Sequence, residues 1–397
     1  MITPKIAAFI ILLPCLINAD PSKTPNWQEL QTTSPYFNKR ALVNYDAIRQ
    51  DMIKNHGFQQ VTFKSEDGIE LAGLLRINPQ ADTTIISCSG FFPGVKEGMS
   101  TLKDVAPNNC NLFFIDARGH GQSKGNFWGY RGNYGRQEYK DIIGAIHYAH
   151  GITHGKKIIV HGVCMGAFHA SHALIKLSDA TDAQTKQPLI EKYNVKGFVS
   201  DSGFHSLCGI RDLLHGHVVN NLLPEKFKSF YNKGKAKEQH LQKKDVLQKT
   251  PYKVAAALCK GIIVSLRSLL IDSDLEWYEP DTRLTDKVHR ISCPIWYVHA
   301  QEDTYSYQKD SAALAENTPV KRTWWVQGEK EHAENHRLHP AEYHEQLSSF
   351  IQYCNSDTWK EEMANSEMHK KPVKSPDINV RLTMSGIEIR GQISKKK

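Results

Sequence analysis

One run of residues, 156–177, constrains the fold more than any other, because a short apolar strand passes there directly into a helix. KKIIVHG has the length and apolar character of a buried strand, and a helical pattern begins at Gly166. Gly162 and Gly166 stand two residues either side of Cys164. Glycine is tolerated where strand and helix backbones nearly touch, so the run predicts a strained turn at Cys164.

This turn places a thiol beside the N-terminus of a helix. The partial positive charge and unpaired N–H groups found there favour a thiolate at Cys164, and the amide of Met165 could bind an oxyanion. A small apolar cysteine in such a turn can equally serve packing alone. The pentapeptide Gly-Val-Cys-Met-Gly by itself leaves both interpretations open.

The rest of the chain predicts an α/β sheet. Residues 59–65 and 69–78 alternate in polarity around Gly68, which indicates a hairpin. Short apolar runs, typical of parallel strands buried on both faces, follow at 83–89, 111–117, 156–162, 195–201, 293–300 and 321–328. Helical periodicity is clearest at 137–150, 166–177 and 340–353, so crossover helices should cover the sheet.

The first nineteen residues are typical of a cleavable secretory signal peptide. Lys5 precedes an apolar run over 6–17, and the small residue Ala19 precedes a polar stretch. The run is interrupted by Pro14 and is too short to span a bilayer comfortably. We therefore expect a secreted or periplasmic protein.

Export permits disulfides, but the cysteines do not fix a pattern. The chain has eight, and if Cys15 leaves with the signal peptide an odd number remains, so at least one thiol stays unpaired. Bridges between Cys208 and Cys259, or between Cys293 and Cys354, are conceivable.

The net charge of +8 is concentrated in the lysine-rich residues 226–249 and in the C-terminal tail. These are either ordinary solvated surface or a surface attracted to an anionic membrane or other polyanion.

The alternation of strands and helices stops within 205–290, which indicates a helical insertion over the carboxyl edge of the sheet. Its apolar part, 252–271, is interrupted by basic residues and is more typical of a lid helix than of a membrane span. The expected organisation is a signal peptide at 1–19, an N-terminal arm at 20–57, a core at 58–204 and 291–355 split by a lid at 205–290, and a basic, flexible tail at 356–397 with a hairpin around Ser385-Gly386.

Three further motifs carry a resemblance. NLFFIDARGHGQSKG contains a D-x-R-G-x-G-x-S turn, WYVHAQED places Asp303 after a strand, and WWVQGEKEH places His332 after the last strand. Together with the turn at Cys164, their order resembles the α/β-hydrolase superfamily over 58–204 and 291–355. The resemblance implies an α/β-hydrolase fold, mostly parallel with helices on both faces, and a nucleophile, acid and histidine in that chain order.

By this resemblance Cys164 is the nucleophile, Asp303 the acid and His332 the base. Asp201, after the strand at 195–201, is a rival acid. His336 and His339 are rival bases, although His332 lies nearest the strand end. Histidine is needed because a thiol at its ordinary pKa is mostly protonated at neutral pH.

The resemblance also implies an oxyanion hole made by the amides of Met165 and Phe91, although Ser89 stands where the family often has histidine. Aromatic residues that could wall an acyl pocket, or simply pack in the core, are Phe91, Phe92, Phe127, Trp128 and Tyr130. Cysteine at this turn is similar to the dienelactone hydrolases, whereas the segment around Asp116 is closer to serine esterases and acyl hydrolases.

We therefore expect a secreted hydrolase that cleaves a carboxylic ester, lactone or thioester through an acyl-cysteine intermediate. No cofactor, metal or nucleic acid is expected, and the substrate should be a small-molecule or lipid ester. The alternative is a catalytically inactive scaffold that acts as a binding protein, possibly at an anionic membrane surface. The sequence leaves the acyl group, the leaving group and the oligomeric state open.

Overall fold

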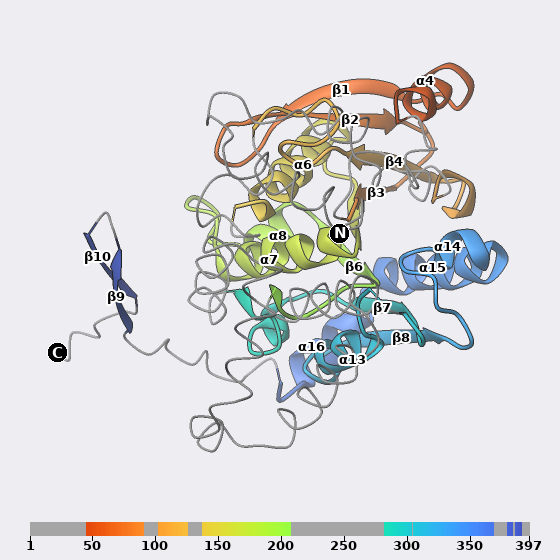
Figure 1. The fold of residues 1–397 in the computed structure, drawn as a ribbon. Helices are drawn as coiled ribbons and strands as arrows, with labels where there is room; N and C mark the ends of the chain where they lie inside the picture. Colours follow the sequence, from red (N-terminus) through yellow and green to blue (C-terminus); the bar gives the residue numbers. More distant parts are fainter. Residues whose placement is uncertain are drawn as a thin grey trace, which may run out of the picture.

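The computed structural model describes residues 45–90, 102–125, 137–207, 282–303 and 305–368, and the backbone of 379–383 and 386–390. Its centre is an eight-stranded sheet in the order β1-β2-β4-β3-β5-β6-β7-β8 (Figure 1). The strands are β1 Gln59–Lys64, β2 Glu70–Arg76, β3 Thr83–Cys88, β4 Cys110–Ile115, β5 Lys157–Val163, β6 Val195–Asp201, β7 Ile295–Ala300 and β8 Lys321–Val326. β2 is antiparallel to β1 and β4, and the other neighbours are parallel.

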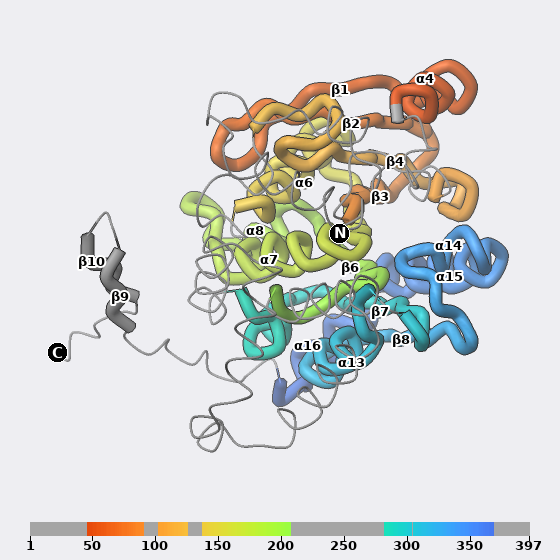
Figure 2. Tube along the Cα trace, viewed as in Figure 1, coloured from red at the N-terminus to blue at the C-terminus, as the bar shows by residue number. Residues whose placement is uncertain are grey.

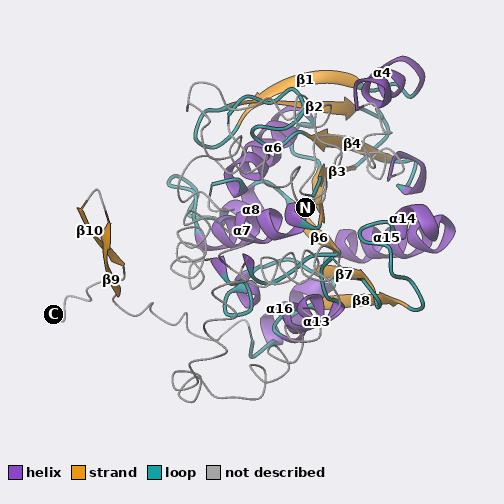
Figure 3. Ribbon diagram, viewed as in Figure 1, coloured by secondary structure: helices purple, strands orange, loops and turns teal. Residues whose placement is uncertain are grey.

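Helices cover both faces of this sheet (Figure 3). They are α4 Tyr45–Asn55, α6 Tyr139–Ile152, α7 Met165–Asp179, α8 Leu189–Lys192, α13 Gln308–Glu316, α14 Asn335–Leu338, α15 Pro340–Ser356 and α16 Trp359–Asn365, with a 3-10 turn η2 at Val288–Arg290. α6 and α7 contribute to one buried cluster, and α4 and α15 to the other.

The two clusters explain the sequence pattern of the strands. Ile158 and Val160 of β5 belong to the cluster under α6 and α7, whereas Ile159 between them belongs to the cluster under α15. Successive side chains of a strand point to opposite faces, so a strand buried on both faces is mostly apolar along its whole length. Every residue of β3 and β4 is accordingly buried.

Both predicted hairpins form. β1 and β2 pair antiparallel through a turn in which Gly68 has φ +85°, as a tight turn requires. β9 (Asn379–Thr383) and β10 (Gly386–Arg390) also pair antiparallel, around residues 384–385. Among the residues that the structure describes, none of the helices has both the length and the apolarity needed to cross a bilayer.

The prediction of a flexible tail from residue 356 onward is wrong for residues 359–365. These form α16, and its Trp359 and Met363 are buried against the core. The indole of Trp359 donates to the carbonyl of Cys354 at 2.9 Å. The expected signal peptide, most of the N-terminal arm, and the lid over 208–281 lie outside the described residues.

The two halves of the core lie side by side although residues 205–290 separate them in sequence. In Figure 2 the green β6 lies next to the teal β7, and Phe198 of β6 is in register with Ile295 of β7. Parallel strands end at the same edge of a sheet. The carboxyl ends of β5, β6, β7 and β8 therefore meet at one edge, which is where the candidate site lies.

Candidate active site

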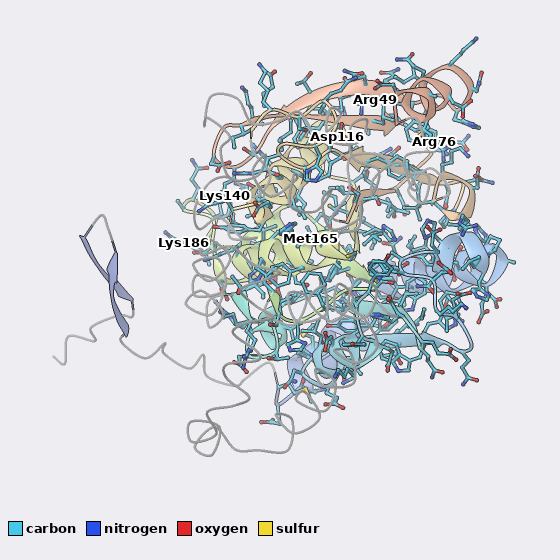
Figure 4. All side chains as sticks on the ribbon, in the orientation of Figure 1. Arg49, Arg76, Asp116, Lys140, Met165 and Lys186 are labelled. Carbon is cyan, nitrogen blue, oxygen red and sulfur yellow. The ribbon has the colours of Figure 1, made fainter. Side chains whose placement is uncertain are left out.

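Cys164 lies between the last residue of β5 and the first residue of α7, with φ 54° and ψ −116°. This conformation is rare for residues other than glycine and is found mainly where the surrounding structure enforces it. The thiol is partly exposed. Met165 follows at the start of α7, in the interior of the molecule (Figure 4), where the first backbone N–H groups have no acceptor within the helix.

Close backbone contacts explain the glycines around Cys164. A Cβ atom at Gly162 would lie 2.5 Å from the Cα of Ala167, and one at Gly166 would lie 2.3 Å from the carbonyl oxygen of Cys88. Both distances are far below van der Waals contact. Gly90 lies on the other side of the turn, where a Cβ atom would be 2.9 Å from that of Cys164. The predicted strained turn is thus confirmed, together with its steric cause.

The structure brings together the three side chains that the sequence selected as a catalytic set. Asp303 follows β7, His332 follows β8, and Nδ1 of His332 donates to Oδ2 of Asp303 at 2.7 Å. The same imidazole hydrogen-bonds the side chain of Cys164. A continuous path of hydrogen bonds therefore runs from carboxylate through imidazole to sulfur.

The loop that follows Asp303 fixes its carboxylate. Oδ1 accepts hydrogen bonds from the backbone N–H groups of Tyr305 at 2.7 Å and Ser306 at 3.1 Å. Oδ2 receives His332 and also faces Nε2 of His299 at 3.3 Å. Burial alone would raise the pKa of Asp303, but the hydrogen bonds from His299 and His332 hold it well below its ordinary value.

The pKa of His332 is shifted in the opposite direction, upward. Burial alone would lower its pKa, but the charge of Cys164 and the hydrogen bonds with Asp303 and Cys164 outweigh burial and raise the pKa to about 10. A pKa of about 10 favours the protonated imidazole at neutral pH, where the ring lies between the carboxylate of Asp303 and the sulfur of Cys164. A protonated imidazole hydrogen-bonded to a thiol favours the thiolate form of that thiol.

The rival acid Asp201 is buried at the end of β6 and contacts other groups. Its carboxylate accepts from Asn335 at 2.9 Å and from the hydroxyl of Tyr343 at 3.2 Å. Its backbone carbonyl accepts from the amide of Cys164 at 2.8 Å. Asp201 thus links the backbone of the turn to the loop that carries His332.

The rival histidines also point elsewhere. His336 is buried with its ring 5.8 Å from that of Tyr343, in an edge arrangement. His339 lies 3.5 Å from a carboxylate oxygen of Glu329. Within the described part of the chain, no three His, Cys, Asp or Glu side chains are grouped closely enough to hold a metal ion.

Several predicted pocket residues cannot be placed. Phe91, whose amide was the second expected oxyanion donor, lies outside the described residues, as do Phe92, Phe127, Trp128 and Tyr130.

One aromatic residue of the site was missed by the sequence analysis. The ring of Tyr305 lies 5.5 Å from that of His332, at an interplanar angle of 33°. Its position two residues after Asp303 was the available signal.

The D-x-R-G turn after β4 has a structural role. Asp116 is fully buried and accepts from Arg49 of α4 at 2.8 Å; both residues are labelled in Figure 4. Arg118 bonds Asp141 at 2.7 Å and Asp67 at 2.8 Å, so it ties α6 to the first hairpin. The motif stabilises the fold beside the site and contributes no group to the catalytic set.

The other described cysteines differ from Cys164. Cys88, Cys110, Cys293 and Cys354 are buried and free, so the conceivable bridge between Cys293 and Cys354 is not formed. Burial raises the pKa of each of these four thiols above its ordinary value. Cys208 and Cys259 lie outside the described residues.

Comparisons with known proteins find similarity only in structure. No protein-family model and no curated protein matches the chain. An esterase from Pyrococcus furiosus is 18% identical and aligns over 75% of this chain and 92% of its own, with a TM-score of 0.47. A proline iminopeptidase from Mycobacterium smegmatis is 13% identical over 75% and 99% of the two chains, with a TM-score of 0.46. An alpha/beta hydrolase from a Penicillium species is 15% identical over 77% and 99%, with a TM-score of 0.48.

These similarities are too low to transfer an activity or a substrate. The strand order carries the assignment instead: two antiparallel pairings at one edge, followed by parallel strands with helices on both faces. β5 leads into the turn at Cys164, and β7 and β8 lead to Asp303 and His332. By its architecture, this chain has an α/β-hydrolase fold.

Proposed function

We propose that the protein hydrolyses a carboxylic ester, lactone or thioester through an acyl intermediate on Cys164. The observation that supports this most strongly is the connected set of Asp303, His332 and Cys164 at one edge of the sheet. These are the nucleophile, the base and the orienting group that covalent acyl transfer requires.

In the first step the thiolate of Cys164 attacks the acyl carbon, and a C–S bond forms while the carbonyl oxygen becomes an oxyanion. The amide of Met165, at the N-terminus of α7, is the proposed donor that stabilises that charge. The oxyanion then collapses and the bond to the leaving group breaks. His332 gives its proton to the departing oxygen or sulfur.

The second step requires His332 to act as a base, and acylation itself promotes this change. The thiolate charge is one of the causes that keep His332 protonated. Once the sulfur is acylated this charge is gone, so the pKa of His332 falls and the neutral imidazole can accept a proton from water. The resulting hydroxide attacks the thioester, the C–S bond breaks and the carboxylic acid leaves. Cys164 returns to the thiolate while His332 keeps the proton taken from water.

The proposal extends to where the protein acts. The leader-like residues 1–19 support a secreted or periplasmic location, and the basic residues 226–249 support peripheral contact with an anionic membrane. A small-molecule or lipid ester is the proposed substrate class.

Intact-mass spectrometry after incubation with a panel of aryl esters and thioesters tests the chemistry. We expect a mass increase equal to the acyl group, located on the peptide that contains Cys164, and loss of turnover in Cys164→Ala. Cys110→Ala is the control, since Cys110 is a buried thiol at the opposite end of the parallel strands. Unchanged turnover in Cys164→Ala would reject the proposal. Absence of both turnover and adduct in the unmodified protein would favour an inactive binding scaffold.

A further inference from the structure

A second histidine lies behind the Asp303–His332 pair. His299 is the fifth residue of β7 and is completely buried. Its Nε2 atom lies 3.3 Å from Oδ2 of Asp303, the same oxygen that accepts from His332 at 2.7 Å. The acid of the proposed catalytic set is therefore contacted by one imidazole from β7 and by one from the loop that follows β8.

Hydrogen-bond partners fix where His299 carries a proton. Nε2 lies 2.9 Å from the backbone carbonyl of Ser306, and a carbonyl oxygen can only accept. Nε2 must therefore carry hydrogen. That N–H faces the Ser306 carbonyl and Oδ2 of Asp303 together, so it is a shared donor to both.

The other nitrogen is held by a rotatable hydroxyl. Nδ1 of His299 lies 2.7 Å from Oγ of Ser311, and this oxygen lies 2.9 Å from the carbonyl of Gly203. If Nδ1 is bare, the hydroxyl of Ser311 donates to it. If Nδ1 is protonated, it donates to Ser311, which then donates to Gly203. The ring is hydrogen-bonded at both nitrogens in either state.

We propose that His299 is a positioning residue for the Asp303–His332 pair: its Nε2–H holds the carboxylate of Asp303 so that Oδ2 faces His332. The backbone donors from Tyr305 and Ser306 hold Oδ1. Oδ2 faces the hydroxyl of Ser306 at 3.5 Å, and His299 adds a shorter contact at 3.3 Å that opposes rotation of the carboxylate. Replacing a residue that orients a functional side chain through a hydrogen bond typically costs about 10–100-fold in affinity or activity.

Other ionisable groups on the packed elements contact different partners. His205, which follows β6, and Asp310, in the first turn of α13, pair with each other at 3.4 Å. Facing Asp303 are His299, His332 and, through His332, Cys164. The protonation state of the Cys164 thiol should therefore depend on how firmly the carboxylate of Asp303 is held in place.

The inference rests on the proposed roles of Cys164, His332 and Asp303, but its test needs no turnover. The rate of alkylation of Cys164 by iodoacetamide is measured against pH by peptide mass spectrometry. If Asp303 is held less well, the imidazolium is less stabilised and the thiolate takes up a proton at higher pH. We expect His299→Phe to move the acid midpoint of this profile upward by about one pH unit, since one lost hydrogen bond corresponds to roughly that shift.

Two further variants distinguish the loss of the hydrogen bond donated by Nε2 of His299 from a nonspecific disturbance of the structure. His299→Gln retains an N–H near the position of Nε2, so it should show a clearly smaller shift. His172→Phe is the matched control, because His172 also contacts a backbone carbonyl, that of Thr282 at 3.0 Å, but lies on α7. It should leave the profile in place. If His299→Phe fails to fold, Ser311→Ala replaces it and should give a smaller upward shift, through loss of the partner of Nδ1.

An unshifted profile in His299→Phe, or in Ser311→Ala when that variant replaces it, would overturn the proposal. So would equal shifts in His299→Phe and His172→Phe, or a Gln variant as shifted as the Phe variant. If the protein hydrolyses no ester but the variants show the expected shifts in the alkylation profile, the proposed function is rejected. The positioning role of His299 is then retained.

Discussion

His332 donates to Asp303 across 2.7 Å while the same imidazole hydrogen-bonds Cys164, so one ring joins two acidic groups. Because the ring is shared, a change at either partner alters the protonation of His332. The predictions below use this coupling, the steric demands of the turn at Cys164, and one buried ion pair.

Replacing the nucleophile should change the titration of the histidine. Cys164→Ala removes a charge and a hydrogen bond that both raise the pKa of His332, so the pKa should fall below the value of about 10. The change in pKa is downward because an anion stabilises the imidazolium, and the variant lacks that anion. NMR titration of ¹⁵N-labelled imidazole groups measures the change. Cys110→Ala should leave the midpoint in place, and an unaltered midpoint in Cys164→Ala would contradict the thiolate–imidazolium pair.

Asparagine variants of the two candidate acids, Asp303 and Asp201, should differ in their effects on kcat and on the free energy of unfolding. Asp303→Asn places an amide against His332 and disturbs its orientation, so kcat should fall by about 10⁴, as in triads whose acid is replaced. Asp201→Asn should retain most of the turnover and lose about 1–3 kcal/mol of stability, because its carboxylate accepts from Asn335 and Tyr343. Steady-state kinetics and urea unfolding of both variants make the comparison. The reverse ranking of rates would assign the acid to Asp201.

The glycine after the turn should tolerate no side chain. In Gly166→Ala the new Cβ would lie 2.3 Å and 2.6 Å from the carbonyl oxygens of Cys88 and Ser89, which are backbone atoms and cannot move cheaply. We expect a loss of about 3 kcal/mol in the free energy of unfolding. Gly151→Ala is the matched control, since no atom lies within 4 Å of its added Cβ. It should be neutral or stabilising by up to about 1 kcal/mol. Equal unfolding midpoints for the two variants would refute the steric account.

The ion pair between Arg49 and Asp116 offers a double-mutant test. Both side chains are fully buried, so Arg49→Met or Asp116→Leu alone leaves an uncompensated charge and should cost about 3–5 kcal/mol. The double variant should be less destabilised than the sum of the two single variants. Urea unfolding of all four proteins measures the coupling, and simple additivity would show that the two charges do not depend on each other.

Much of the sheet could be predicted because strands buried on both faces leave a plain signal. Each of the six predicted apolar runs overlaps a strand, and the glycine pattern around Cys164 predicted the strained turn. Asp303 and His332 were expected from the resemblance to the α/β-hydrolase superfamily, whose motif order has the acid and then the histidine after successive strand ends.

What could not be predicted depends on contacts between distant residues. Nothing in the segment around Arg49 indicates that it pairs with Asp116, 67 residues later. The partners of Asp201 became evident only when Asn335 and Tyr343 were placed beside it. Helix α16 was missed because its polar composition hides an apolar pair, Trp359 and Met363, four residues apart.

The position of Asp201 affects how much the connections around this edge of the sheet can vary in length. Its carbonyl holds the amide of Cys164 and its carboxylate holds Asn335, three residues after His332. Asp201 thus gives the segments that carry the sulfur and the imidazole a common anchor, in addition to the bond between Asp303 and His332. Evolution can therefore lengthen, shorten or replace the connections around this sheet edge while the reacting atoms keep their separation.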